Sequence, residues 1–206
     1  MRFLELLEGR SHPCIVVDVQ PEYSGMNDGD ENPVFEEIIR FVNNQTGPVL
    51  MYVNAEEQGL SGDTIDGIKI YWEDSGFSPD NWHRVQIIDK GYGFLRSWMD
   101  GGISPAAIIK TIRFMYQSKV NDSRELFGGE DSDEYEQGMK NLLGWEYKDW
   151  MSSDPLTINN FSVAQLKKFS GAYLMGGGRN ECLREVELIM NASNIKYKRI
   201  NSLIYG

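Results

Sequence analysis

Three residue types spread along the chain could together break an acyl bond: a carboxylate, an ammonium group and a thiol. Asp18 closes the apolar run PCIVVDVQ, Lys90 closes VQIIDK, and Cys182 follows three glycines in LMGGGRNECL. The thiolate is the nucleophilic form of cysteine, and a free thiol with a pKa of about 8.5 is mostly protonated at neutral pH. A helix N-terminus and a nearby lysine favour the thiolate. A carboxylate can accept the proton of the thiol and pass it on to a leaving amine.

Alternating strand-like and helix-like segments must position these side chains. Near-continuous apolar runs separated by helical periodicity are typical of a parallel sheet with helices on both faces. The sequence therefore predicts an α/β fold. The segments expected as strands are 13–20, 48–55, 85–90, 169–178 and 195–205, and those expected as helices are 32–47, 106–117 and 182–194.

Ligands of such sheets bind beyond the carboxyl ends of the strands. Asp18, Asn54 and Lys90 end the first three expected strands, and the glycine turn before Cys182 ends the fourth. We therefore expect these residues to meet at one edge of the sheet. A purely structural role remains open at this point, because buried cysteines that pack against helices are common.

The composition of the chain limits its possible binding partners and its expected cellular compartment. The 206 residues carry a net charge of -11, which disfavours binding to phosphate backbones. Cys14 and Cys182 provide no disulfide framework, and no segment approaches the ~20 apolar residues of a membrane span. The N-terminal MRFLELLEGR is not typical of a signal peptide. We expect a cytoplasmic protein with free thiols and without nucleic-acid or membrane partners.

One region does not fit the alternation. Residues 119–168 are acidic and aromatic, with turn signals and weak periodicity apart from an expected short helix at 132–143. We interpret them as an insertion, which would cover the pocket or contact another copy of the chain. The acidic run EDSDEYE is expected to be a solvated face, since it lacks the alternating oxygen ligands of a calcium loop.

Three segments resemble the motifs of the isochorismatase-like cysteine hydrolases, a family that includes nicotinamidases. IVVDVQPEY is similar to the family's first strand and places its aspartate on Asp18. IIDKGYGFLRSWMD is similar to the lysine segment and places the lysine on Lys90, with Phe94 in the usual aromatic position. LMGGGRNECLREVELIMNASN is similar to the nucleophile segment, with its glycine on Gly176 and its cysteine on Cys182.

The resemblance implies a fold and a reaction. The fold would be a single three-layer α-β-α domain over 1–206, with the insertion inside it, and a non-proline cis peptide at Gly177–Gly178. The reaction would be hydrolysis of a carbon–nitrogen amide-type bond in a small molecule. Cys182 would be the nucleophile, Asp18 the base and Lys90 the electrostatic partner, and the amides of Gly178 and Cys182 would be the candidate oxyanion donors.

The resemblance and the strand-end rule also indicate which residues would bind the substrate. The expected substrate contacts are Gln20, Tyr23, Asn54, Phe94 and Arg179. No cofactor is expected. No metal is expected either, since the aspartate and two closely spaced histidines of nicotinamidases are missing and His12 and His83 lie far apart. The expected partners are a small-molecule substrate and, as an option, further copies of the chain in a dimer or tetramer.

Departures from the family pattern leave two other functions open. Lys90 and Cys182 lie unusually far apart in sequence, and Arg179 and Leu183 occupy the family's threonine and valine positions. One alternative is a family-like binding protein without catalysis. The other is an α/β protein that binds a nucleotide at the glycine turn. The side chain of Arg179 would either face the pocket and favour an anionic substrate, or pair with Glu181 or Glu185.

Overall fold

The structure is a computed structural model that describes residues 11–24, 33–55, 63–90, 95–128, 133–158 and 161–206. The chain forms two compact units. The sheet unit comprises 1–92, 164–184 and 195–206, and the helical unit comprises 93–163 and 185–194.

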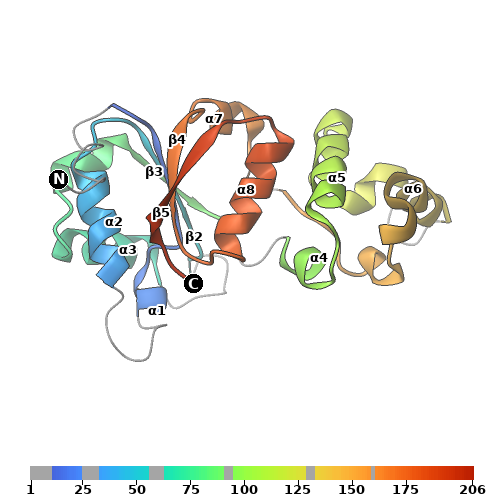
Figure 1. Cartoon of the computed structure of the whole chain (residues 1–206), viewed down its shortest axis with the longest axis horizontal. Coiled ribbons are helices and arrows are strands. Elements are labelled where there is room, and N and C mark those ends of the chain that lie inside the picture. Colours follow the sequence, from blue (N-terminus) through green and yellow to red (C-terminus); the bar gives the residue numbers. More distant parts are fainter. Residues whose placement is uncertain (1–10, 25–32, 56–62, 91–94, 129–132, 159–160) are drawn as a thin grey trace. The chain divides into compact units, whose positions relative to one another are not determined.

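A five-stranded, all-parallel sheet forms the centre of the sheet unit (Figure 1). Its strands lie in the order β3-β2-β1-β4-β5. The chain therefore builds outward from the first strand to the third and then crosses back, so that the fourth lies beside the first. The strands are β1 (Cys14–Val17), β2 (Val49–Val53), β3 (Val85–Asp89), β4 (Ala172–Gly176) and β5 (Tyr197–Ile204).

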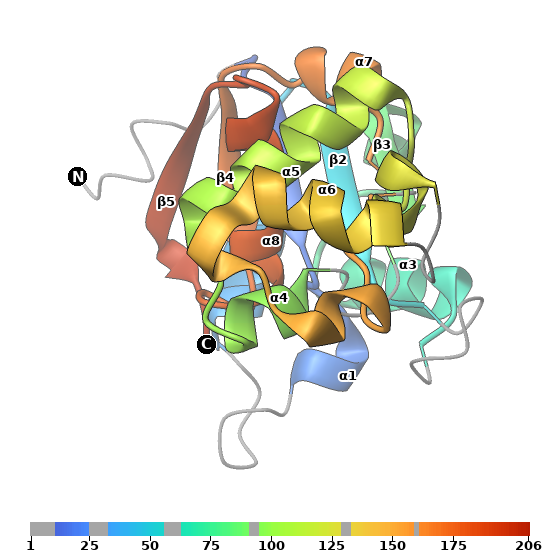
Figure 2. The ribbon, with the colours of Figure 1, turned by 90° about the vertical axis from the view of Figure 1, so that its right-hand side faces the viewer.

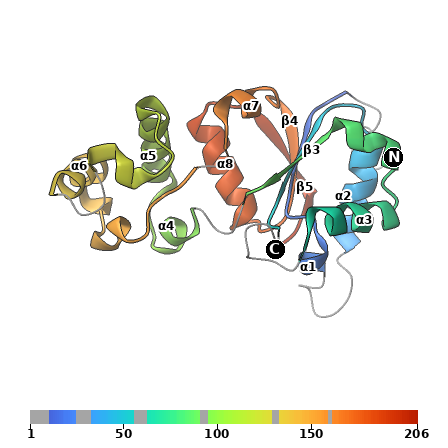
Figure 3. The same cartoon turned by 180° about the vertical axis from the view of Figure 1, so that it is seen from behind.

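Helices cover both faces of this sheet, which gives three layers (Figures 1 and 3). One face packs under α2 (Pro33–Asn43) and α3 (Ile65–Asp74), which share an apolar cluster with alternate sheet residues such as Val16 and Met51. The other alternates, such as Val17 and Leu50, are also fully buried. The helix α7 (Val163–Lys167) and the first residues of α8 (Cys182–Ala192) lie on this second side.

The helix α3 shows how local sequence fixes an element. Thr64 has an extended backbone, and its side chain accepts a hydrogen bond from the Gly67 N–H, as an N-cap should. Ile68 and Trp72, four residues apart, point into the core. The Trp72 indole donates to the Val19 carbonyl at 2.8 Å, so this helix holds the chain directly after β1.

The helical unit consists of helices and 3-10 turns (Figure 2). Ser104 caps its longest helix, and the Glu146 carboxylate in turn accepts from the N–H and hydroxyl of Ser104 at 2.7 and 2.9 Å. Trp98 and Tyr135 are buried there. The helices of this unit are α4 (Arg96–Asp100), α5 (Pro105–Ser118) and α6 (Asp133–Leu143), with the 3-10 turns η4 (Ser123–Phe127), η5 (Gly144–Glu146) and η6 (Asp149–Ser152).

The predicted α/β fold is confirmed, and each expected strand contains an observed one. The helix expected at 132–143 is α6. Local sequence patterns did not predict α3, the short α1 (Pro21–Ser24) or the 3-10 turn η3 (Pro79–Arg84). The bounds of the insertion also differ: the helical unit begins at Gly93, so that α5 belongs to it and not to the layers of the sheet.

Among the residues that the structure describes, no helix combines the length and the apolar character that crossing a membrane requires.

Trp72→Phe tests the link between α3 and the chain after β1. The change leaves the buried Val19 carbonyl without its donor, so we expect the free energy of unfolding to fall by about 2 kcal/mol. Urea denaturation followed by circular dichroism measures this loss. Trp145→Phe is the matched control, because Trp145 is 85% exposed and its replacement should change stability by less than about 0.5 kcal/mol. Equal losses in the two variants would contradict the assignment.

Candidate active site

The candidate site lies at the topological switch point of the sheet. The strand order reverses between β1 and β4, which pair directly, with Val17 opposite Gly176. In open parallel sheets, ligands bind in the crevice outside the carboxyl ends of the strands at such a point. Asp18 directly follows β1, and the turn from Gly176 to Cys182 directly follows β4. Both belong to the sheet unit.

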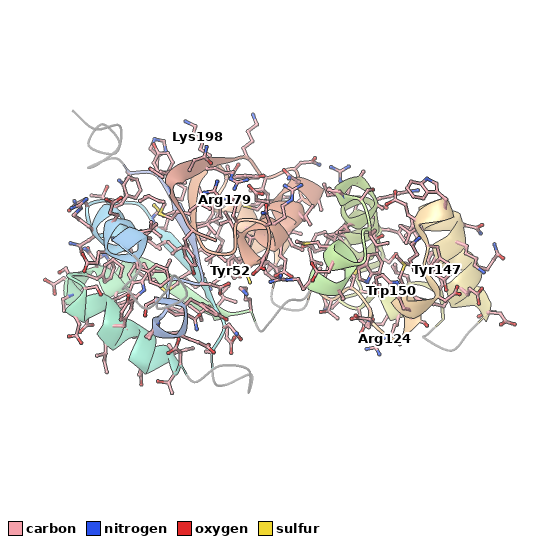
Figure 4. The ribbon with its side chains drawn as sticks, turned by 60° about the horizontal axis from the view of Figure 1, so that its bottom comes forward. Tyr52, Arg124, Tyr147, Trp150, Arg179 and Lys198 are labelled. Carbon is pink, nitrogen blue, oxygen red and sulfur yellow. The ribbon has the colours of Figure 1, made fainter. Side chains whose placement is uncertain are left out.

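The backbone of Asp18 is held in a conformation that few residues adopt. Its φ of 53° lies in the left-handed region, where a non-glycine residue is uncommon and is often found at functional sites. Its N–H donates to the carbonyl of Tyr52, labelled in Figure 4, at 2.9 Å. Its carbonyl accepts a hydrogen bond from the hydroxyl of Tyr205. The peptide groups on both sides of the side chain are therefore fixed.

Lys90 reaches Asp18 across the end of the intervening strand. β2 lies between β1 and β3, so the main chains of the two residues are about 10 Å apart, or two strand spacings. The Lys90 N–H donates to Val53 at 2.9 Å, which anchors the start of the side chain. Its Nζ lies 3.2 Å from Asp18 Oδ2, and both side chains are almost completely buried. A lysine suits this position because its long side chain spans one strand.

Burial governs the electrostatics of this pair. Loss of solvent raises the pKa of Asp18 above its ordinary value, while the Lys90 charge and the Cys182 thiol act in the opposite direction. The Lys90 ammonium lies within ion-pair distance of Asp18 Oδ2, and the Cys182 thiol is a second side chain that acts on this carboxylate. A buried, raised-pKa carboxylate of this kind is a stronger base than an exposed one.

Close packing explains the three glycines before Cys182. A Cβ on Gly176, whose φ is 113°, would lie 2.1 Å from the Val17 carbonyl oxygen. A Cβ on Gly177 would lie 1.7 Å from the Tyr205 ring, and Gly178 has a φ of 66°. The cis peptide expected at Gly177–Gly178 is wrong, because the described chain contains none. Positive φ values and close contacts explain the glycines without it.

The thiol of Cys182 meets the carboxylate of Asp18. Cys182 is the first residue of α8, and its side-chain interaction with Asp18 is one of the influences that lower the Asp18 pKa. It is 8% exposed, whereas Cys14 is fully buried within β1. Burial raises the pKa of Cys14 to about 12, against a smaller opposing influence of Arg84. The structure thus brings the three expected catalytic residues together and provides an inert thiol for comparison.

Polar residues after β1 and β2 form the surroundings of the pair. Gln20 is fully buried, and its side-chain amide makes two hydrogen bonds to the backbone of Asn54. Its Nε2 donates to the Asn54 carbonyl at 2.7 Å, and its Oε1 accepts from the Asn54 N–H at 2.9 Å. The Asn54 amide donates to the Tyr23 hydroxyl at 2.9 Å. Burial raises the pKa of Tyr23 to about 12; the charge of Asp18 adds to this rise, and that of Lys90 opposes it. Gln20 therefore supports the site, while Tyr23 lies within its electrostatic field.

The remaining expected contacts have different outcomes. Phe94 lies outside the described residues. Arg179, labelled in Figure 4, is exposed and its guanidinium donates to the Ile204 carbonyl at 3.2 Å. This partner is neither a pocket nor one of the two glutamates considered above. Arg179 ties the turn after β4 to the end of β5.

Tyr205 is the residue that the sequence analysis missed. It follows Ile204, the last residue of β5, and so lies at the same carboxyl edge as Asp18 and Lys90. Burial raises its pKa well above the usual value, and the charges of Asp18 and Cys182 add to this effect. The strand-end rule that selected the other residues also selects this one when it is applied to the last strand.

Comparisons with known proteins found no matching family model, no matching curated protein and no matching solved structure.

Lys90→Met tests whether the ion pair neutralises a buried carboxylate. Removing one partner of a buried pair costs about 3 kcal/mol, so we expect a loss of this size in the free energy of unfolding at pH 8. The loss should shrink toward pH 5, because a carboxyl with a raised pKa takes up a proton as the pH falls and no longer needs the cation. Urea denaturation at each pH measures the loss.

Two variants complete this test. Asp18→Asn/Lys90→Met, which removes both charges, should recover most of the stability that Lys90→Met loses. Lys69→Met breaks an exposed pair with Asp66, in which the side chains are 41% and 89% exposed, and should cost less than about 1 kcal/mol at either pH. A Lys90→Met loss that is independent of pH and persists in the double variant would contradict the description of the pair.

Proposed function

We propose that this chain is a cysteine hydrolase that cleaves a carbon–nitrogen amide-type bond in a small molecule. The observation that carries the proposal is the buried Asp18–Lys90 pair beside Cys182 at the switch point of a parallel sheet. The resemblance of the three motifs to isochorismatase-like hydrolases agrees with it. Perturbed ionisable groups that gather at a ligand-binding edge are typical of active sites.

In the first step Asp18 acts as a general base. It takes the proton from the Cys182 thiol while the sulfur attacks the carbonyl carbon of the amide. A C–S bond forms, and the carbonyl π-electrons move to oxygen to give a tetrahedral oxyanion. Lys90 favours the ionised carboxylate that accepts this proton, since its charge lowers the pKa of Asp18 against the larger, opposite effect of burial.

The oxyanion needs donors near the nucleophile. The N–H of Gly178 makes no hydrogen bond within the described part of the chain, and Gly178 directly precedes the segment that leads to Cys182. The N–H of Cys182 belongs to the first residue of α8, where the helix dipole also favours negative charge. These two amides are the proposed oxyanion donors.

The intermediate then collapses. The C–N bond breaks, and protonated Asp18 gives its proton to the leaving nitrogen, so that ammonia or an amine departs and a thioester remains on Cys182. Water attacks the thioester while Asp18 accepts one of its protons. The C–S bond breaks, the sulfur regains a proton, and a carboxylic acid is released. Every proton moves through Asp18, which is the reason for placing a basic carboxylate against the thiol.

The alternative of nucleotide binding at the glycine turn has less support. A phosphate site at a helix N-terminus is usually assisted by a lysine or arginine. The cation on this turn, Arg179, is directed to the Ile204 carbonyl, and the residue before the helix is the acidic Glu181. A catalytically inactive binding protein is the alternative that the experiment below separates from the hydrolase.

Ammonia release from a panel of small primary carboxamides tests the proposal. We expect wild type and Cys14→Ser to hydrolyse at least one amide at similar rates, because Cys14 is buried in β1 away from the site. Cys182→Ser and Asp18→Asn should each lower kcat by about 10³-fold or more, since groups that act as a unit fail together.

The contradicting result is equally specific. Amide hydrolysis that survives Cys182→Ser would exclude the proposed nucleophile. Absence of hydrolysis across the panel, with Cys182 alkylated by iodoacetamide no faster than Cys14, would favour the binding protein.

A further inference from the structure

The end of β5 departs from regular pairing next to the candidate site. Leu174 pairs with Arg199 and Gly176 pairs with Ile204, so β5 advances five residues where β4 advances two. Extra residues of this kind bend a strand and redirect its side chains, and they occur often beside active sites. Here the irregularity brings Tyr205 level with Gly176, and the Tyr205 N–H donates to the Gly176 carbonyl at 3.2 Å.

Tyr205 contacts both halves of the site. Its hydroxyl donates to the Asp18 carbonyl, within a buried environment. Its ring lies where a Cβ on Gly177 would be, and packs against Phe35 of α2 with the ring centroids 4.7 Å apart. Its own carbonyl accepts from the Arg179 N–H at 3.2 Å. One residue thus links the peptide of the proposed base to the turn that carries the nucleophile.

The Tyr205 hydroxyl helps to hold the unfavourable backbone conformation of Asp18. A left-handed backbone at a non-glycine residue costs free energy and persists only where the surroundings hold it. The neighbouring Tyr52 fixes the N–H side of Asp18, and Tyr205 fixes the carbonyl side. The raised pKa of Tyr205 means that its hydroxyl keeps the proton that it donates.

We propose that Tyr205 is a positioning residue that sets the distance and direction of the Asp18 carboxylate relative to the Cys182 thiol. This inference rests on the proposed hydrolase function and concerns the same site. It predicts that removing one oxygen atom, the Tyr205 hydroxyl, changes the ionisation behaviour of Cys182.

The test is the pH profile of Cys182 alkylation by iodoacetamide, quantified by peptide mass spectrometry, in wild type and Tyr205→Phe. Phenylalanine keeps the ring over Gly177 and removes only the donor. We expect the rate at pH 7 to fall about fivefold, the size of effect of one buried hydrogen bond, and the profile to move to higher pH. Tyr135→Phe is the matched control, because its buried hydroxyl donates to the Met151 carbonyl in the helical unit. Its profile should equal that of wild type.

Asp18→Asn separates the two possible failures. A changed profile in Asp18→Asn with an unchanged profile in folded Tyr205→Phe overturns the role of Tyr205 and leaves the hydrolase proposal intact. An unchanged profile in Asp18→Asn overturns both. If Tyr205→Phe does not fold, Phe35→Leu decides, since it loosens the same ring and keeps the hydroxyl. A shift in the same direction supports the inference, and a wild-type profile overturns it.

Discussion

A carboxylate and an ammonium group, Asp18 and Lys90, face each other at 3.2 Å with 3% and 0% of their side chains exposed. Burying two charges costs several kcal/mol for each ion, and their attraction repays this cost only when the geometry is good. The all-parallel sheet provides that geometry, because β1 and β3 end at the same edge and hydrogen bonds to β2 fix the backbone of both residues. Replacing a buried ion pair by apolar residues of similar volume is often neutral for stability. The two charges at the switch point therefore need no role in stability, which agrees with the catalytic role that we propose for them.

The nucleophile turn meets a second constraint, which is the shortage of space where β4 ends beside β1. Gly176 lies against the Val17 backbone and Gly177 against the Tyr205 ring, so neither position has room for a side chain. As a consequence of this close packing, α8 begins beside Asp18, with Cys182 as its first residue. The contrast with Cys14 is informative. Both thiols are buried residues of the same unit, yet only Cys182 has a carboxylate partner, a helix N-terminus and a small exposed area.

The order of apolar runs was enough to predict the strands, their parallel arrangement and the strand-end residues Asp18, Asn54 and Lys90. This prediction succeeded because the alternation of strands and helices is a local pattern, and the carboxyl-edge rule depends only on topology.

The predictions that failed depended on contacts between distant segments. Tyr205 comes level with Gly176 only through three extra residues in the pairing of β5, which no local pattern predicts. Arg179 binds a carbonyl that only the folded end of β5 supplies. The cis peptide was wrongly expected at the glycine turn because a run of glycines has more than one possible cause. Positive φ values and a lack of space for a side chain select glycine just as a cis peptide would. The early start of the helical unit, at Gly93, was likewise hidden because α5 has an ordinary amphipathic pattern.

The central claim is that one buried ion pair makes one of two thiols a nucleophile. It is tested most directly by trapping the acyl group. Wild type is mixed with p-nitrophenyl acetate, quenched in acid within the first turnover, and mapped by peptide mass spectrometry. The account predicts an acetyl thioester on Cys182, none on Cys14, and acylation of Asp18→Asn slowed by about 10²-fold or more, as expected for loss of a general base. Acetylation of Cys14, or acylation of Cys182 at the same rate in wild type and Asp18→Asn, would contradict it.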